Sequence, residues 1–111
     1  MDYKFADFIE KLPKADIPFQ GVDTRLIQGG DHQVVFFRIP AGASVPPHSH
    51  AAQWGLVVSG RIEITIGGAT RQCGPGDAYD IGKDEIHEVK CLEDTVAIDF
   101  FDDPARYRIR A

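Results

Sequence analysis

Two histidines separated by one residue, His48 and His50, are the first side chains in this sequence that could bind one metal ion together. On a β-strand, residues two apart point to the same face, and a rise of ~3.3 Å per residue sets them about 6.6 Å apart along the strand. Two imidazoles placed in this way can reach a common ion. Pro46 and Pro47, just before them, fix the backbone φ on the approach. Alone, the pair is equally compatible with two surface or core histidines.

A third histidine and a glutamine strengthen the metal interpretation. In the run from His87 to Cys91, the charged residues Glu88 and Lys90 occupy one face, so His87 is expected to point inward on the other. A buried imidazole needs a partner, and three inward-facing histidines therefore favour a metal site over core packing. Gln53, three residues past His50, could add its amide oxygen as a neutral ligand, although a lone glutamine is usually solvated or hydrogen-bonded.

Short strands joined by turns rich in glycine and proline are expected to position these residues. The run 61–66 alternates polar and apolar residues, and Gly67 and Gly68 after it predict a tight hairpin turn. The predicted strands are 22–28, 33–39, 45–50, 54–59, 61–67, 69–73, 77–81, 86–91 and 95–101. One helix is predicted over residues 5–12, where apolar residues recur at helical spacing before Pro13. This pattern indicates a sandwich or a barrel, and a closed barrel would remove exposed edges.

Composition limits the possible functions. The 111 residues suffice for one domain, and 43% of them are hydrophobic, which is enough for one core. A net charge of −5 disfavours nucleic-acid binding, and no apolar run approaches the length of a membrane span. The first residues do not read as a signal peptide, so a cytoplasmic location is expected, with Cys73 and Cys91 as reduced thiols.

The spacing around the first two histidines resembles the first motif of the cupin family, G-x5-H-x-H-x(3,4)-E-x6-G. Here Gly42 is followed by five residues, His48 and His50, two residues, Gln53, six residues and Gly60. Two departures stand out. Gln53 replaces the usual glutamate, and the loop before it is one residue short.

The second cupin motif, G-x5-P-x-G-x2-H-x3-N, also has its full spacing here. It runs from Gly76 through Gly82 and Asp84 to His87 and Cys91. Gly82 replaces proline, Asp84 replaces glycine and Cys91 replaces asparagine. The first two changes fall in a turn and should be tolerated. Joint spacing of histidines and glycines is a more specific signal than one HxH pair.

The resemblance implies an all-β cupin, a double-stranded β-helix or jelly-roll-like barrel, as a single domain over residues 1–111 with a short N-terminal helix or strand. It also implies a homodimer and one divalent transition metal, such as Zn, Fe, Ni or Mn, bound by His48, His50, His87 and Gln53. Such ligands carry no charge, so the ion would keep its full double charge and polarise a bound oxygen more strongly. If Gln53 is not a ligand, a three-histidine site with more open positions remains.

The C-terminal segment resembles the D-x-F-x-P-x-R tail of small one-domain cupins from uronate breakdown. Those proteins open the ring of unsaturated or keto-deoxy uronic acids and use a His/His/Gln/His metal site. The resemblance maps the tail onto Asp99, Phe101 and Arg106, with Arg108 as the alternative because one extra residue precedes Arg106. Asp99 would act as general acid or base, and the arginine would bind a substrate carboxylate. Tyr79 is expected to line the barrel mouth or to pack within its strand.

We therefore expect a metal-binding cupin that acts as an isomerase or lyase on a small sugar acid. Two other functions stay open. One is an iron dioxygenase acting on a small organic substrate, and the other is a non-catalytic cupin that binds or senses a small ligand. Equally, Asp99 could be a structural hydrogen-bonding residue and the arginines solvated tail residues. The fold alone does not choose among these functions, because cupin barrels host many.

Overall fold

The computed structural model describes residues 1–110, which form one short helix and nine strands. The elements are α1 (Asp7–Glu10), β1 (Asp23–Gln28), β2 (Gln33–Ile39), β3 (Ser44–His48), β4 (Gln53–Ser59), β5 (Ile62–Ile66), β6 (Ala69–Cys73), β7 (Ala78–Ile81), β8 (His87–Cys91) and β9 (Thr95–Phe101). Each predicted strand is therefore present, with ends that differ by at most two residues. The all-β prediction is confirmed.

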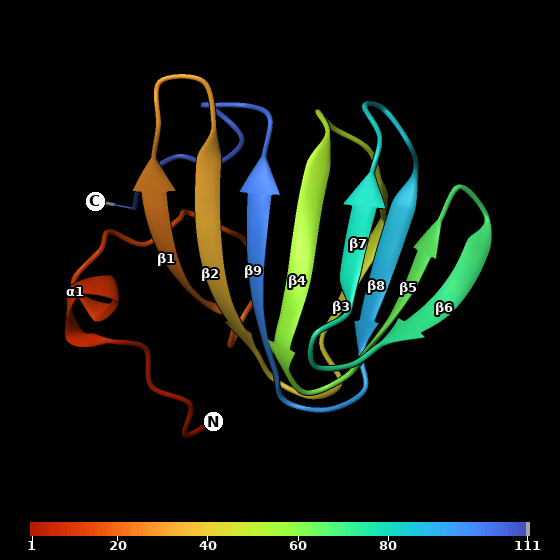
Figure 1. Cartoon of the computed structure of the whole chain (residues 1–111), viewed down its shortest axis with the longest axis horizontal. Coiled ribbons are helices and arrows are strands. Elements are labelled where there is room, and N and C mark those ends of the chain that lie inside the picture. The colour runs from red at the N-terminus through yellow and green to blue at the C-terminus, as the bar shows by residue number, and fades with distance from the viewer. Residues whose placement is uncertain (111) are drawn as a thin grey trace.

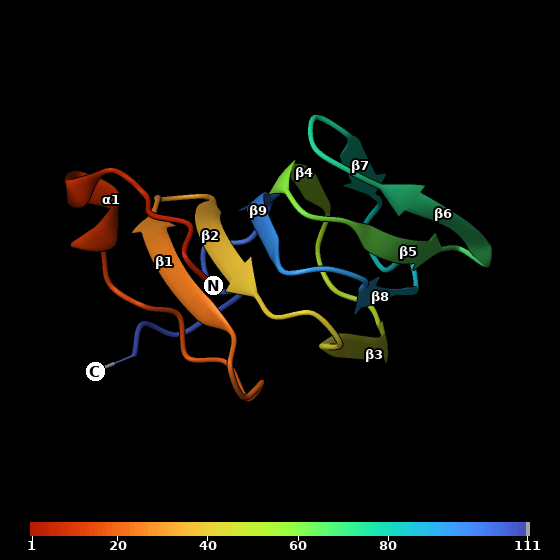
Figure 2. The ribbon, with the colours of Figure 1, turned by 90° about the horizontal axis from the view of Figure 1, so that it is seen from below.

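The strands form two antiparallel sheets (Figure 1). One sheet has the order β1-β2-β9-β4-β7, and the other has the order β3-β8-β5-β6. Seen from below, β7 and β3 lie on opposite sides of the molecule (Figure 2). Within residues 1–110, every ladder lies inside one sheet, so the barrel is two facing sheets rather than one continuous hydrogen-bonded cylinder.

The core lies between the two sheets. Its main cluster draws side chains from β4, β5, β6, β7 and β8, namely Val57, Ile62, Ile64, Cys73, Tyr79, Ile81 and Cys91. Val57 and Ile64 are fully buried, and burial of such side chains stabilises a fold by about 1.5–3 kcal/mol each. Both cysteines are buried free thiols, as expected.

Strand β3 ends earlier than predicted. It stops at His48, so His50 lies just outside the strand rather than on it. Val45 pairs with Val89, yet His48 pairs with His87, which shifts the register by one residue across the two prolines. Proline donates no ladder hydrogen bond, and β3 is an edge strand, where prolines are tolerated.

The predicted helix over residues 5–12 is reduced to the single turn of α1. Ala6 at its N-cap makes no side-chain cap, and Phe8 is 75% exposed, so only part of the apolar face predicted for this helix is covered. No helix within residues 1–110 has the length and apolar character needed to cross a membrane.

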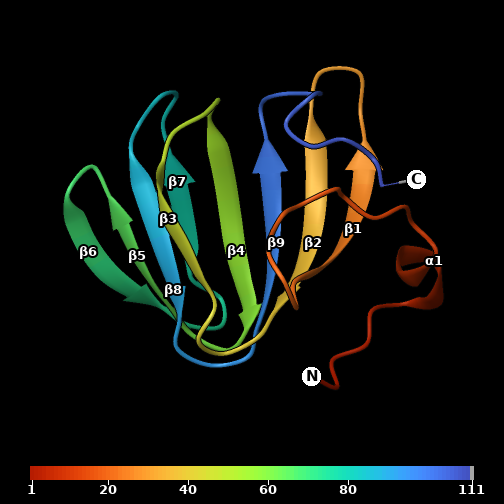
Figure 3. The same cartoon turned by 180° about the vertical axis from the view of Figure 1, so that it is seen from behind.

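The segment between α1 and β1 crosses the face of β2 and β9 (Figure 3). It is tied to the C-terminal segment by an isolated bridge between Ala15 and Ile109. Ile17 and Phe19 from this segment line the same pocket as Phe37 on β2. The N-terminal segment thus forms part of the wall of the pocket described next.

Candidate metal centre

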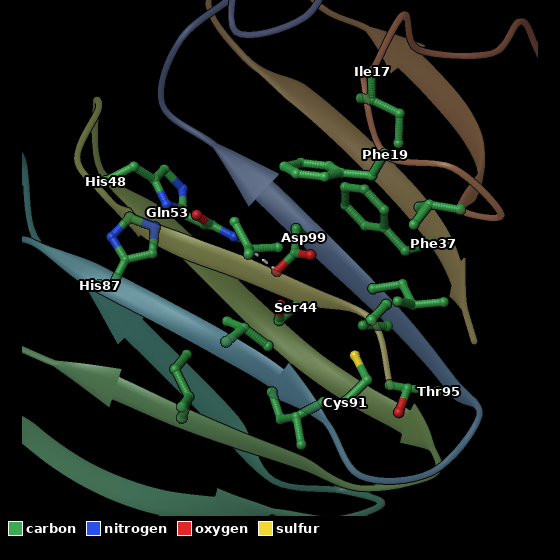
Figure 4. Close-up of a pocket in the computed structure, with 18 of the residues that line it drawn as sticks. Ile17, Phe19, Phe37, Ser44, His48, Gln53, His87, Cys91, Thr95 and Asp99 are labelled. Atoms are coloured by element: carbon green, nitrogen blue, oxygen red, sulfur yellow. Dashed lines mark hydrogen bonds between the residues drawn. The ribbon is translucent and has the colours of Figure 1, made fainter. Parts of the chain in front are cut away.

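The three histidines predicted as ligands meet at one end of the β3–β8 pair. Figure 4 shows two of them, His48 and His87, side by side. His48, the last residue of β3, lies opposite His87, the first residue of β8, and their ring centroids are 4.2 Å apart. The His50 ring lies 5.1 Å from His48 and 4.8 Å from His87. One ligand nitrogen from each ring lies within 4.8 Å of the other two. Two segments distant in sequence therefore supply one cluster.

His50 is held in the cluster although it lies outside β3. The backbone N–H of Asp84, in the turn before β8, donates to the carbonyl oxygen of His50 at 2.8 Å. Asp84 has φ 61°, and among residues 1–110 no other non-glycine residue has a positive φ. Aspartate enters this left-handed region more readily than most residues. Asp84 therefore does the work of the glycine that the cupin motif has at this position.

The hydrogen bonds of the three rings select their tautomer. Each Nδ1 lies at hydrogen-bond distance from a backbone carbonyl oxygen, which can only accept, so each Nδ1 carries the proton. The acceptors for His48, His50 and His87 are the carbonyls of Pro46, Ala51 and Glu85, at 2.8, 2.7 and 2.9 Å. The Nε2 lone pair of every ring is then free to bind an ion. A hydrogen bond from the ring nitrogen that does not bind the ion is typical of metal-ligating histidines.

The electrostatics also favour neutral rings. Burial lowers the pKa of His50 to about 4; the bond to the Ala51 carbonyl opposes the shift, and the positive charge of Arg106 adds to it. Burial also lowers the pKa of His87, and His48 and Arg106 add to that shift. Neutral imidazoles near pH 7 are ready to bind a cation without first losing a proton. The donor set therefore fits a divalent transition ion.

Gln53, the first residue of β4, lies beside this cluster (Figure 4). Its Nε2 donates to Oδ1 of Asp99 at 3.1 Å, which orients the side-chain amide. Among the described residues, none donates to its Oε1, so this oxygen remains free to act as a ligand. Gln53 as fourth ligand and the three-histidine site both remain predictions.

Asp99 on β9 is buried, as its inward position predicted. Its Oδ1 accepts from the Tyr79 hydroxyl at 2.6 Å and from Gln53. Burial raises the pKa of Asp99 to about 6, although these two hydrogen bonds favour the ionised form. A carboxyl group with such a pKa can take up or release a proton near neutral pH.

Arg106, rather than Arg108, lines the pocket of the three histidines. Its guanidinium lies over the rings of Phe101 and Tyr107, with centroid distances of 5.7 and 4.4 Å. Its Nε is buried and has no hydrogen-bond partner among residues 1–110. Arg108 is exposed and lines a neighbouring hollow. The guanidinium of Arg106 therefore has donors left over for a bound ligand.

The pocket around these groups has a volume of about 220 Å³. The predicted residues Tyr79, Asp99, Phe101 and Arg106 all line it together with the histidines. Most other walls are aliphatic or aromatic, such as Phe37 on β2. Because the pocket walls are largely apolar, the local dielectric is low, and each electrostatic contact that a ligand makes with the few polar groups is stronger.

Sequence reasoning missed three contributors to this site. Phe19 lies in a loop, where periodicity carries no signal, and Tyr107 follows the last strand. Gly55 lies in the middle of β4, directly opposite Asp99 and Tyr79. A glycine inside a strand is the one available signal, because it often marks a close approach of neighbouring groups.

The fold and the histidine cluster define a cupin. Residues 35–101 match the family described as Cupin domain, and the chain belongs to this family. The resemblance noted in the two motifs is thereby confirmed.

The chain is similar in sequence and structure to KdgF proteins, one of which is named for pectin degradation. It is 35% identical to the pectin degradation protein KdgF of Dickeya dadantii over 85 residues. The matched region covers 73% of this chain and 77% of that protein. The structure of KdgF from a Halomonas species has a TM-score of 0.74 at 30% identity, over 83% of this chain and 86% of that chain. An RmlC-like cupin from Shewanella frigidimarina, at 23% identity and a TM-score of 0.78 over 96% and 93% of the two chains, supports the fold alone.

His87→Ala is expected to weaken the binding of a divalent transition ion by at least about 100-fold, because it removes one of three converging imidazoles. Elemental analysis of the purified protein and calorimetric titration with Zn(II) measure this. The matched control is His32→Ala, since the His32 side chain is 46% exposed and pairs with Asp102 at 3.2 Å. Undiminished binding by the His87 variant, or an equal loss in the control, would contradict the site.

Proposed function

We propose that this cupin is a metal-dependent isomerase or lyase that acts on a small, uronate-like sugar acid. One observation carries the proposal: a buried carboxyl group, Asp99, lines the same small pocket as three histidines and the guanidinium of Arg106. A positive group to bind a carboxylate, a proton-transfer group and a candidate metal centre are the parts that such a reaction needs.

The ligand is anchored by charge. The guanidinium of Arg106, stacked on the aromatic rings of Phe101 and Tyr107, keeps its orientation while it donates to the carboxylate of the sugar acid. His48, His50 and His87, with Gln53 as the fourth ligand, would hold the ion. When bound, such an ion acts as a Lewis acid that polarises a carbonyl or hydroxyl oxygen.

Asp99 moves the proton. Its Oδ1 is engaged by Tyr79 and Gln53, whereas its Oδ2 has no partner among the described residues. Oδ2 is therefore the atom that takes a proton from the sugar acid and returns it at another position. An isomerisation leaves the formula of the substrate unchanged, so Asp99 ends each turnover in its starting state. The surrounding apolar walls keep water from competing for that proton.

Pocket size and kinship support the substrate class. A volume of about 220 Å³ suits a monosaccharide rather than an oligomer. Largely apolar walls suit an acid with few hydroxyl groups, such as an unsaturated or deoxygenated uronate. The related KdgF protein of Dickeya dadantii is named for pectin degradation, and pectin is built largely of uronic acids.

The protein loaded with a divalent ion is expected to accelerate the loss of ultraviolet absorbance of a 4,5-unsaturated uronate monomer. Asp99→Asn keeps the shape of the side chain but removes the proton-transfer group, so the rate should fall by about 10²- to 10⁴-fold. Asp80→Asn, the same change at an exposed position on β7, is the matched control and should retain the rate.

A rate no higher than the spontaneous one, with the ion present, would remove this function. Oxygen uptake coupled to substrate loss in the Fe(II)-loaded protein would favour a dioxygenase instead. Thermal stabilisation by the uronate without turnover would favour a binding or sensing role.

Arg106→Met is expected to raise KM for the uronate by about 10- to 100-fold, because a charge-assisted hydrogen bond contributes ~1.5–3 kcal/mol. Steady-state kinetics on preparations of equal metal content measure this change. Arg108→Met tests the alternative alignment of the tail and should alter KM less. A larger effect at Arg108 would contradict the role given to Arg106.

We also propose that the protein works as a cytoplasmic homodimer, an expectation that rests on resemblance to cupins of this size. Trp54 and Phe100 lie opposite each other on β4 and β9 and are 46% and 43% exposed. This apolar outer face of the five-stranded sheet is available for contact between copies.

A further inference from the structure

Two residues that line the pocket, Tyr79 and Asp99, lie on either side of a glycine on the strand between their own. Gly55 on β4 lies opposite Asp99 on β9 and, on its other side, opposite Tyr79 on β7. Tyr79 and Asp99 are therefore two strands apart, yet the Tyr79 hydroxyl donates to Oδ1 of Asp99 at 2.6 Å. The bond spans the backbone of the strand between them.

The glycine makes this bond possible. A Cβ at position 55 would lie 2.1 Å from ring atoms of Tyr79 and 2.2 Å from Oδ1 of Asp99. Real Cβ atoms do not approach other atoms so closely, so any side chain at this position would separate the pair. Gly55 has no positive φ, and the need for glycine here comes from the close approach alone.

The same bond gives the two carboxyl oxygens of Asp99 different surroundings. Oδ1 accepts from both Tyr79 and Gln53, which turns the carboxyl plane to one orientation. Oδ2 has no partner in the described part of the chain, and Asp99 lines the pocket, so Oδ2 is the oxygen presented to a ligand. Tyr79 is itself only 5% exposed, which limits its own contact with a ligand.

Stability alone does not explain a buried tyrosine and a buried carboxyl group. Desolvating an ionisable group destabilises a fold, and apolar side chains of similar size would pack in the same space at no such cost. Retaining both groups makes sense where the carboxyl group must face a substrate in a fixed direction.

We propose that Tyr79 is a positioning residue, whose hydroxyl bonds to Asp99 across the gap at Gly55 and aims Oδ2 at the substrate. This inference rests on the proposed role of Asp99 in proton transfer. The sequence left Tyr79 either at the barrel mouth or packed within its strand; it lines the pocket, and its proposed role is exerted through Asp99. Gly55 acts in turn by leaving the space that the bond occupies.

The test is Tyr79→Phe, which removes only the hydroxyl. In the metal-loaded protein, kcat on the 4,5-unsaturated uronate should fall about 10- to 100-fold, because a small misplacement of a reacting group has effects of this size. KM and metal content should stay within about twofold, because the three histidines would still hold the ion and Arg106 would still bind the carboxylate, and no hydrogen bond joins Tyr79 to any of them in the described residues. Tyr3→Phe removes a hydroxyl far from the pocket and is the control. An unchanged kcat, or a loss explained by lower metal content, would overturn the proposal.

A double-variant cycle separates positioning from an independent role. If Tyr79 acts through Asp99, adding Tyr79→Phe to Asp99→Asn should lower kcat by less than about threefold further. A full additional loss would assign Tyr79 a direct role and overturn the inference.

A crystal structure of the Tyr79→Phe protein gives a readout that does not depend on turnover. The Asp99 carboxyl group should turn, and its contact with Gln53 should lengthen beyond hydrogen-bond distance. An unmoved carboxyl group would overturn the positioning role even if the wild-type protein proved inactive on uronates. Conversely, a turned carboxyl group in an inactive protein would sustain the positioning role while the proposed function fails.

Discussion

The register of β3 against β8 is the constraint on which the whole site depends. Before the two prolines, Val45 lies opposite Val89, and in an unshifted ladder residue 47 would then face His87. The shift across Pro46 and Pro47 brings His48 to that place instead. Because neighbouring residues on a strand face opposite sides, a slip of one residue would turn an imidazole away from the pocket. The shift at the two prolines thus sets which side chain meets His87.

The charges of the residues around the candidate metal centre are distributed unevenly. The candidate ligands are neutral, so they would not offset the positive charge of a bound ion. They are His48, His50, His87 and Gln53. Asp99 accepts a hydrogen bond from Gln53, and Arg106 lines the same pocket as the histidines. A protein of net charge −5 therefore offers an anion a local positive region inside an apolar pocket.

Much of this arrangement follows from alternation along strands. The inward position of His87 could be predicted because the charged residues Glu88 and Lys90 occupy the other face of its strand. That of Asp99 follows from the parity that it shares with Ala97 and Phe101. The two motifs identified the candidate ligands because their spacing spans two strands that meet in the fold. Short strands with glycine turns were enough to define the fold class.

Other features could not be predicted, for physical reasons. Periodicity does not reveal a register shift, so β3 was extended to His50. Helical spacing over residues 5–12 predicts a helix only if a surface covers its apolar face, and Phe8 remains exposed. The bond between Tyr79 and Asp99 depends on the order of three strands, which local sequence does not contain. The choice between Arg106 and Arg108 depends on the path of a loop.

The central claim is that side chains from β3 and β8 converge on one ion. X-ray absorption spectroscopy of the Zn(II)-loaded protein tests it most directly, because imidazole rings give a characteristic outer-shell scattering pattern. The account predicts three imidazole ligands with Zn–N distances of about 2.0–2.1 Å, together with oxygen ligands. A first shell of oxygen atoms only, or with a single imidazole, would contradict it.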